Sequence, residues 1–272
     1  MREKDKLIIW DFDGVLFDSL RECAVVLLLS IKILNNTFDF ETIENIDQLS
    51  SDKEINAILK KIRPLRPFII KGQDYIWQYI NYEKFDKLFP SFSDYKEIFD
   101  SIYDDEKDKL YEKTFYEARK LLQISLKESY FNLFFPFKGA LAAIKESISM
   151  NKNYICSARD FNAIKFMLER NGIYFNENKI YAKDHNNGKN DQSITKREQI
   201  KNILSIEGYL DKEFILIEDQ INLPLTLMKE FSKIKIIYAK YGYGKGEECS
   251  IFNEESISFI EESESILKLV VN

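Results

Sequence analysis

Short apolar runs, each followed by a helical pattern, occur towards both ends of this chain, and this alternation limits the folds it can adopt. Five runs have the length and residue types of buried strands: 7–10, 153–156, 179–182, 213–217 and 234–239. Continuous apolar runs of this length are typical of strands buried on both faces of a parallel sheet. Strands that alternate with helices predict an α/β fold built on a doubly wound parallel sheet of about five strands.

The segment 18–135, between the first apolar run and the others, carries almost only helical patterns. It includes a capping-box pattern at 51–54 and an apolar stripe at helical spacing from Tyr111 to Leu126. The stretch 63–67, RPLRP, is expected to be a turn or an extended link, because proline disfavours helix. We therefore expect an α-helical domain at 18–135, inserted into an α/β core formed by 1–17 and 136–272.

Composition narrows the classes of partner. The 272 residues have a net charge of −6, so the chain has no general attraction for nucleic acid or anionic membranes. No apolar run approaches the roughly 20 residues of a membrane span, and no signal-peptide core follows the charged N-terminus. Three scattered cysteines fit buried thiols in a reducing compartment. We expect a globular, cytoplasmic protein whose partner is a small molecule.

The first polar residues after an expected strand are Asp11, Phe12, Asp13 and Gly14. In phosphoryl transfer, one carboxylate can attack phosphorus while a second donates a proton to the leaving oxygen and later activates water. Glycine lets the backbone turn sharply behind them. An acidic turn after a strand is the alternative interpretation of so short a motif.

Two further polar features directly follow later strands. Ser157 directly follows the second strand and precedes a helix, where a hydroxyl and free amides can bind phosphate oxygens or simply cap the helix. The acids Glu218 and Asp219 end a very apolar strand, and carboxylate oxygens are ligands that Mg²⁺ prefers. Ligands of open parallel sheets bind at such strand ends. The order of the features along the chain is therefore the specific signal.

Lys196 begins an expected helix that Thr195 and Glu198 cap. The helix dipole disfavours a cation at this end, so an anionic ligand or nearby carboxylates would explain the lysine. A solvated lysine is the alternative interpretation. Lys189 and Arg197 are lower-ranked candidates for the same role.

The segments DFDGVLFDS, ICS and IED, together with the single lysine, resemble the four motifs of the haloacid dehalogenase superfamily. The resemblance covers 6–20 and 134–246, including the Pro-Gly-hydrophobic segment before the second strand. The Glu-Asp pair is most similar to the branch of β-phosphoglucomutase and phosphoglycolate phosphatase, whose cap is also inserted just after the first motif. The resemblance implies a Rossmann-like core with an inserted α-helical cap.

The resemblance also implies roles for individual residues. Asp11 would be the nucleophile that forms an aspartyl-phosphate, and Asp13 the general acid and base. Ser157 and Lys196 would bind the transferring phosphoryl group, together with Gly14, Ala158 and Arg159. Mg²⁺ would be held by Asp11, the backbone carbonyl of Asp13, Asp219 and, directly or through water, Glu218. The implied activity is Mg²⁺-dependent hydrolysis of a small phosphomonoester.

Departures from the family pattern leave alternatives open. After the Glu-Asp pair the chain has Gln220, Asn222 and Leu223, so Asn222 or water would complete the metal site. A phosphotransferase or phosphomutase would use the same residues, and a weakened metal site would leave a binding module. His185 is expected to be a solvated loop residue, and the segment 241–244, YGYG, resembles a loop of related phosphatases.

Overall fold

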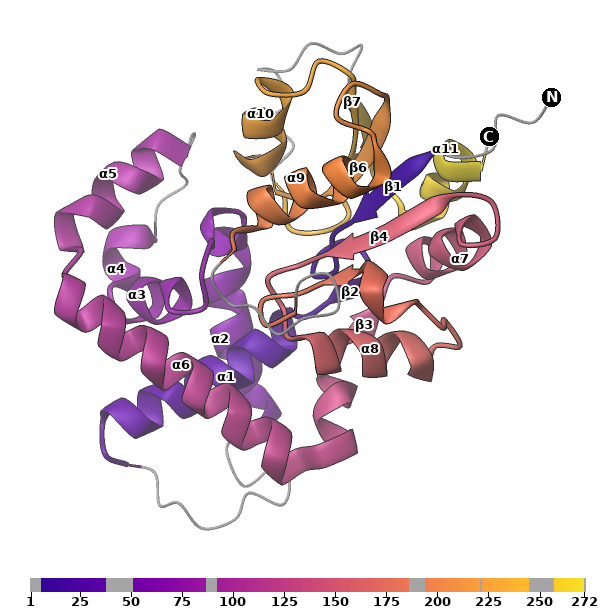
Figure 1. Ribbon diagram of the computed structural model, residues 1–272. Helices are drawn as coiled ribbons and strands as arrows, with labels where there is room; N and C mark the ends of the chain where they lie inside the picture. The colour runs from indigo at the N-terminus through magenta and orange to yellow at the C-terminus, as the bar shows by residue number, and fades with distance from the viewer. Residues whose placement is uncertain are drawn as a thin grey trace. The chain divides into compact units, whose positions relative to one another are not determined.

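The computed structural model describes residues 6–37, 51–86, 92–185, 194–220, 222–244 and 257–271. The chain forms two compact units, one of Met1–Asp18 with Pro136–Asn272 and the other of Ser19–Phe135. The first unit is α/β and the second is helical (Figure 1). Within the described ranges, no helix combines the length and the apolar character needed to cross a bilayer.

The α/β unit is built on a six-stranded sheet in which every described pairing is parallel. In spatial order its strands are β5 (Ile180–Tyr181), β4 (Lys152–Cys156), β1 (Leu7–Trp10), β6 (Phe214–Glu218), β7 (Ile234–Ala239) and β8 (Ile257–Ile260). The chain adds strands on one side of β1 and then on the other, so the sheet is doubly wound. This confirms the predicted fold class.

The edge strand β8 was not predicted. Ile257 and Ile260 at its two ends are buried, whereas Ser258 is exposed and Phe259 is half-buried. The polar Ser258 interrupts the apolar residues of this four-residue strand, which makes its apolar pattern weak.

The register of the central strands brings their carboxyl ends to one edge. Trp10 in β1 pairs with Ile155 of β4 on one side and with Ile217 of β6 on the other. Parallel strands run in the same direction, so the residues that follow these three leave the sheet together. The side chains after β1, β4 and β6 therefore share one region of space.

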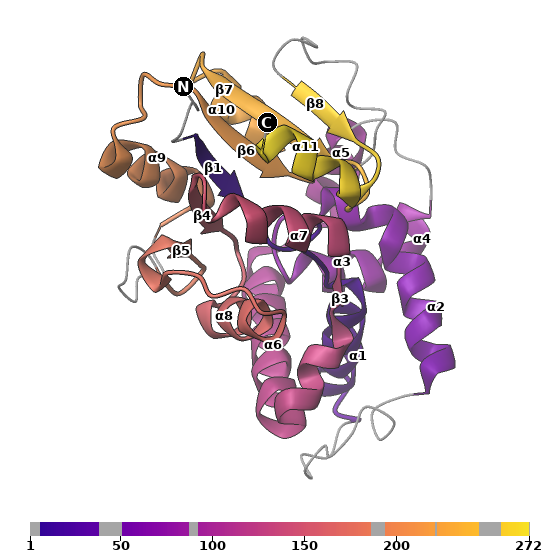
Figure 2. The same ribbon diagram turned by 90° about the vertical axis from the view of Figure 1, so that its right-hand side faces the viewer.

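Helices cover both faces of this sheet, and Figure 2 shows α7 and α11 on the side opposite α10. The helices of the unit are α7 (Lys138–Ser147), α8 (Phe161–Arg170), α9 (Lys196–Glu207), α10 (Asn222–Met228) and α11 (Ile266–Val271), with 3-10 helices η4 (Glu177–Lys179) and η7 (Ser263–Ser265). Buried side chains of α9 and α10, including Ile203 and Leu227, pack with Ile9 and Leu216 of the sheet. Burial of such apolar area stabilises the unit.

The helical unit begins directly after β2 (Phe17–Asp18), which forms a separate two-stranded sheet with β3 (Phe135–Pro136). Its elements are α1 (Leu20–Leu34), α2 (Asp52–Ile62), η2 (Arg63–Phe68), α3 (Asp74–Ile80), α4 (Tyr82–Phe85), α5 (Phe92–Ile102), α6 (Asp105–Leu126) and η3 (Lys127–Leu133). Ser51 and Glu54 form the predicted capping box at the start of α2. The predicted stripe from Tyr111 to Leu126 lies on α6.

The RPLRP stretch forms the 3-10 helix η2 rather than an extended link. Pro64 lies in the first turn, where its missing N–H would have no partner within the helix. Pro67 comes close to the end of the element, which stops at Phe68. Two prolines are thus accommodated because the element is short.

A buried ion pair joins two helices of this unit. Glu22 of α1 is fully buried and accepts hydrogen bonds from Nε and Nη2 of Arg119 in α6, at 2.8 and 3.1 Å. The hydroxyl of Tyr130 donates a third, at 2.5 Å. Because the pair is bidentate and further hydrogen bonded, the buried charges are compensated.

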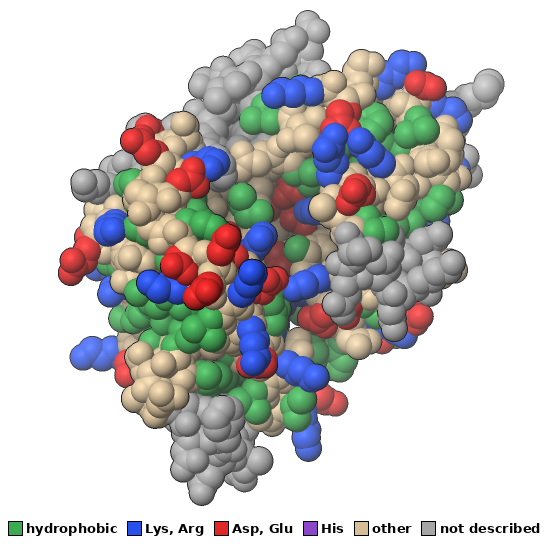
Figure 3. Space-filling model, turned by 60° about the vertical axis from the view of Figure 1, so that its left-hand side comes forward, with side chains coloured by type: hydrophobic (Ala, Val, Ile, Leu, Met, Phe, Trp, Pro, Cys, Tyr) green, Lys and Arg blue, Asp and Glu red, His purple; other side chains and the backbone are tan. Residues whose placement is uncertain are grey.

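Charged side chains of both signs are interspersed on the face of the molecule shown in Figure 3. Lys and Arg alternate there with Asp and Glu, and hydrophobic side chains lie between them. This mixed surface agrees with the small net charge of −6.

Candidate active site

The residues after β1 form a tight turn at the edge of the sheet. The backbone N–H of Asp11 donates to the carbonyl of Ile217 in β6 at 2.9 Å, which continues the ladder by one step. Oδ1 of Asp11 then accepts from the N–H of Phe12 at 2.7 Å. Gly14 follows with a φ of +84°, a backbone conformation that residues other than glycine rarely adopt. The turn directs the Asp11 carboxyl group out of the sheet.

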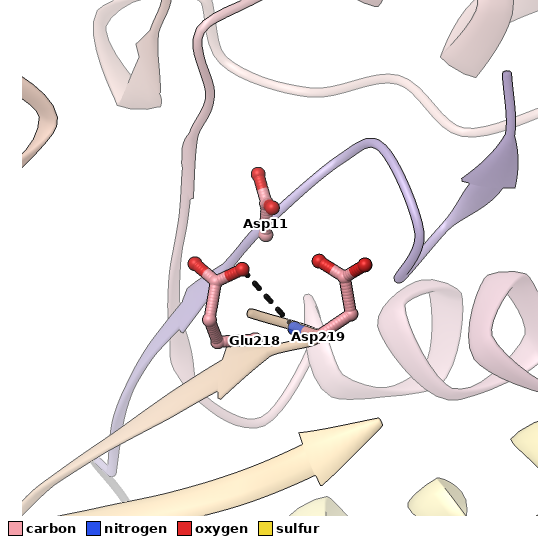
Figure 4. Close-up of side chains that lie close together, drawn as sticks. All are labelled: Asp11, Glu218 and Asp219. Atoms are coloured by element: carbon pink, nitrogen blue, oxygen red, sulfur yellow. Dashed lines mark hydrogen bonds between the residues drawn. The ribbon is translucent and has the colours of Figure 1, made fainter. Parts of the chain in front are cut away.

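Three carboxyl groups meet at this point, from Asp11 after β1 and from Glu218 and Asp219 at the end of β6 (Figure 4). One oxygen of each lies within 4.8 Å of the others, and all three residues are buried. Carboxylate oxygens grouped in this way are ligands that suit a small divalent cation. The structure thus brings together three of the four predicted metal residues by their side chains.

Lys196 lies among these acids. Its Nζ is 2.9 Å from Oδ1 of Asp11 and 2.7 Å from Oε2 of Glu218. Thr195 and Glu198 form the predicted capping box at the start of α9, which fixes the backbone beside the lysine. The cation at a helix N-terminus is explained by the carboxylates that it contacts.

Of the two lower-ranked alternatives to Lys196, the structure describes Arg197. The guanidinium of Arg197 forms an ion pair with Glu230, and its side chain is 48% exposed. Lys189 lies outside the described residues. Of the two candidates that the structure describes, Lys196 is the one that contacts Asp11.

Glu218 uses both of its oxygens. Oε2 binds Lys196, while Oε1 accepts the backbone N–H groups of Asp219 at 3.1 Å and Gln220 at 3.2 Å. Figure 4 shows the bond to Asp219 as a dashed line. The Glu218 carboxylate is therefore well placed to hold the lysine and the turn after β6.

The electrostatics of the cluster call for added positive charge. Burial raises the pKa of Asp11 to about 8, and the Glu218 charge acts in the same direction against the effect of Lys196. Burial also raises the pKa of Glu218. Burial alone would lower the pKa of Lys196, but the charges of Asp11 and Glu218 raise it. The lysine thus stays a cation, whereas ionised Asp11 is disfavoured by its surroundings.

A count of charges agrees with that conclusion. Within the described part of the chain, the cluster holds three carboxyl groups, from Asp11, Glu218 and Asp219, and one cation that contacts it, Lys196. Full ionisation would leave two uncompensated negative charges in a buried region, which is unfavourable. One divalent cation would balance them. The donor set and the charge both fit Mg²⁺.

The residues after β4 lie on the other side of β1. Ser157 is 2% exposed, and its Oγ accepts from the backbone N–H of Arg159 at 3.3 Å. Ala158 between them is exposed. Asp160 caps α8 by accepting from the N–H of Ala163, as expected. Capping is therefore done by Asp160, so the alternative interpretation of Ser157 as a plain cap is wrong.

Asp13 does not join the three-acid cluster through its side chain. Its carboxylate faces Arg159, whose Nε lies 2.9 Å from both Oδ1 and Oδ2. The expected Mg²⁺ ligand from Asp13 is its backbone carbonyl rather than its carboxylate, and that expectation stays a prediction. The pairing with Arg159 was not predicted, because no sequence pattern relates two residues that are 146 positions apart.

The loop that follows β7 packs against the acids. The N–H of Tyr243 donates to Oδ2 of Asp219 at 3.1 Å, and its hydroxyl donates to Oδ1 of Asp18 at 2.7 Å. A Cβ on Gly242 would lie 2.1 Å from the carbonyl oxygen of Gly14. The YGYG segment therefore fits closely around Asp219 and holds its carboxylate.

His185 is buried rather than solvated, so that expectation is wrong. Its ring stacks on Phe161 with the centroids 4.0 Å apart, and the residue is 8% exposed. A backbone bridge to Ala182 fixes its position. Asn222 is half-buried at the start of α10.

Comparison with known proteins reveals likeness at the level of fold. No family model matches the chain, and no curated protein matches it. A haloacid dehalogenase-like family hydrolase from Streptococcus pneumoniae is similar with a TM-score of 0.59 and 14% identity, over 97% of this chain and 98% of that one. A predicted phosphatase from Clostridium acetobutylicum has a TM-score of 0.59, 14% identity and 99% coverage of both chains.

A predicted phosphoglycolate phosphatase from Haemophilus somnus has a TM-score of 0.57 and 14% identity, with 99% of both chains covered. These likenesses extend over the helical segment as well as the α/β core. They show that the chain has the haloacid dehalogenase-like fold, which confirms the fold expected from the motifs.

Proposed function

We propose that this chain is a Mg²⁺-dependent phosphatase that hydrolyses a small phosphomonoester through an aspartyl-phosphate on Asp11. The observation that carries the proposal is the contact of Lys196 with both Asp11 and Glu218, beside Asp219. A nucleophilic carboxylate, a cation and a set of metal ligands are the parts that phosphoryl transfer requires. The likeness to structures described as phosphatases supports the same conclusion.

Mg²⁺ would be held by Asp11 and Asp219, with the backbone carbonyl of Asp13 and, directly or through water, Glu218. The buried carboxyl oxygens of Asp11, Glu218 and Asp219 support this assignment. When bound, the ion would neutralise charge on the phosphoryl oxygens and orient the group. Asn222 or water would complete the ligand set.

Asp11 attacks phosphorus in the first step. The contacts of its carboxylate with Phe12 and Lys196 both engage Oδ1, and we assign the attack to Oδ2. As the new oxygen-phosphorus bond forms, the ester bond breaks and its electron pair moves to the leaving oxygen. Asp13 gives that oxygen a proton, so the alcohol departs neutral.

Water completes the cycle. Asp13, now a carboxylate, takes a proton from a water molecule as the water oxygen attacks phosphorus. The bond between phosphorus and Asp11 breaks, the electron pair returns to the Asp11 carboxylate, and inorganic phosphate leaves. The proton that Asp13 gives to the leaving oxygen is replaced by the proton that it takes from water, so Asp13 is restored.

Lys196 and Ser157 neutralise and bind the transferring group. The Lys196 ammonium already lies between two carboxylates, so it is oriented before the substrate arrives. Gly14, Ala158 and Arg159 are assigned to the same phosphate-binding region. Ala158 is exposed, so its backbone is accessible to a ligand.

We assign the helical segment 18–135 to a cap and the segments 1–17 and 136–272 to the catalytic core. A cap would exclude bulk water and select the leaving group. The free thiols of Cys23 and Cys156 suit a reducing compartment, and we propose that the protein is cytoplasmic.

A phosphate-release screen tests the function. The wild type would be incubated with Mg²⁺ and sugar phosphates, nucleotides and small organic phosphates, beside Asp11→Asn. We expect release from at least one class, and none from Asp11→Asn. Release by Asp11→Asn at the wild-type rate would rule out the aspartyl-phosphate. An isomerised sugar phosphate without net release would identify a phosphomutase instead.

A further inference from the structure

We propose that Arg159 is a positioning residue that fixes the carboxyl group of Asp13 for proton transfer. The inference rests on the proposed function, which assigns that transfer to Asp13. Nε of Arg159 lies 2.9 Å from each oxygen of Asp13, so one N–H group is shared by both. The resemblance assigns Arg159 to phosphate instead, and the two roles predict different kinetics.

The arginine is itself held firmly. Its side chain is 2% exposed, whereas that of Asp13 is 18% exposed. Its backbone N–H donates to Oγ of Ser157 at 3.3 Å, and its carbonyl accepts from the N–H of Lys183 at 2.9 Å. The buried guanidinium is thus anchored to the end of β4, while Asp13 belongs to the turn after β1.

This anchoring restrains a side chain that would otherwise rotate. A partly exposed aspartate explores several rotamers, and few of them place an oxygen within hydrogen-bond reach of a reacting atom. A planar guanidinium fixed by burial selects among these rotamers. Because Arg159 contacts both oxygens equally, it sets the plane of the carboxyl group and forms or breaks no bond in the reaction.

A leaving-group comparison tests the proposal. Phenyl phosphate and 4-nitrophenyl phosphate have similar shapes, but phenolate is the poorer leaving group and depends more on protonation. We expect Arg159→Gln to lower kcat/KM for phenyl phosphate about 50-fold and for 4-nitrophenyl phosphate less than about fivefold, since general acid catalysis supplies about 10²–10⁴-fold. Asp13→Asn should show the same pattern, and Arg159→Lys a weaker one.

The double variant gives a second readout. If Arg159 acts through Asp13, then Asp13→Asn with Arg159→Gln should lose no more activity on phenyl phosphate than Asp13→Asn alone. Arg197→Gln is the matched control, because it removes an arginine whose ion pair is with Glu230. We expect it to alter neither ratio. Thermal unfolding of each variant shows whether it is folded. If Arg159→Gln is not folded, Arg159→Lys replaces it in both comparisons.

Two results would overturn the proposal. Equal losses on both esters, accompanied by weaker inhibition by inorganic phosphate, would mean that Arg159 binds the phosphoryl group. Losses that multiply in the double variant would mean that it acts independently of Asp13. Failure of the proposed function looks different, since the wild type would then release no phosphate or Asp11→Asn would remain active.

Discussion

Gly14 and Asp219 are packed so closely that a Cβ atom on Gly14 would lie 2.2 Å from Oδ2 of Asp219. The two residues come from different strands, so this contact sets how the turn after β1 meets the acids after β6. The same Oδ2 accepts the N–H of Tyr243. The orientation of Asp219, a proposed metal ligand, therefore depends on the absence of a side chain at Gly14.

Gly14→Ala should weaken Mg²⁺ binding by at least about tenfold, because loss of an interaction that orients a ligand has effects of this size. Calorimetric titration with Mg²⁺ measures it. Gly208→Ala is the matched control: Gly208 also has a positive φ, of +70°, but a Cβ there meets nothing within 4 Å. Both variants share the backbone strain. Equal Mg²⁺ affinity in the two would contradict the steric explanation.

Lys196→Met should lower kcat about 10²–10³-fold, the range observed when one preorganised electrostatic contact is removed. The change leaves Asp11 and Glu218 without the cation that lies 2.9 and 2.7 Å from them. Steady-state phosphate release measures the effect. Lys201→Met, on the same helix but paired with Glu230, should retain wild-type kcat. A similar loss in both variants would mean that the helix, rather than the Lys196 charge, is responsible.

Glu22→Gln should lower the free energy of unfolding by about 3 kcal/mol, because it leaves the partly buried Arg119 guanidinium without its counter-charge. Urea denaturation measures the change. Glu117→Gln removes an exposed partner of Lys113, 3.9 Å away, and should have an effect below about 1 kcal/mol. If the two substitutions were equally mild, the buried pair would contribute no more than a surface pair.

Asp74 should make the stability of the helical unit depend on pH. Burial raises the pKa of this carboxyl group from 3.8 to about 6, against the two backbone N–H groups that it accepts from Ile70 and Lys71. The folded protein then holds a proton that the unfolded chain has released, so this contribution is full below about pH 4 and is lost as pH rises through 6. The free energy of unfolding should fall by on the order of 2 kcal/mol over that interval.

Asp74→Asn provides the comparison, since its amide oxygen can accept the same two backbone N–H groups but does not titrate. Urea denaturation of both proteins between pH 4 and 7 gives the difference in unfolding free energy. We expect the wild type to lose stability relative to Asp74→Asn as pH rises. Parallel curves would show that Asp74 does not titrate in this interval.

Much of the core could be predicted because its signals are local. The run at 234–239 forms β7 with those same bounds, and Thr195 caps α9 through Glu198. Both features depend on neighbouring residues only. The meeting of Asp11, Glu218 and Asp219 followed from the rule that parallel strands end at one edge.

What could not be predicted depends on packing between distant segments. Arg159 and Asp13 are 146 residues apart, and nothing in either motif indicates that one guanidinium is aimed at the other. His185 lies in a polar sequence, yet its ring is buried because it stacks on Phe161. The Tyr243 contact with Asp219 likewise arises from the path of a loop. Such details depend on side-chain directions that residue type alone does not fix.

The place of β1 at the centre of the sheet has a consequence for biosynthesis. β1 is made first, but its neighbours β4 and β6 follow only after the whole helical segment and much of the remaining chain. The nascent strand waits for β6 through roughly 200 further residues, about 10–40 s at typical translation rates. During that interval the apolar LIIW run has an unpaired edge, which chaperones can bind and which can pair with other chains in aggregates. Slow synthesis, or truncation before β6, is therefore expected to reduce the yield of folded protein more than the loss of the edge strand β8 would.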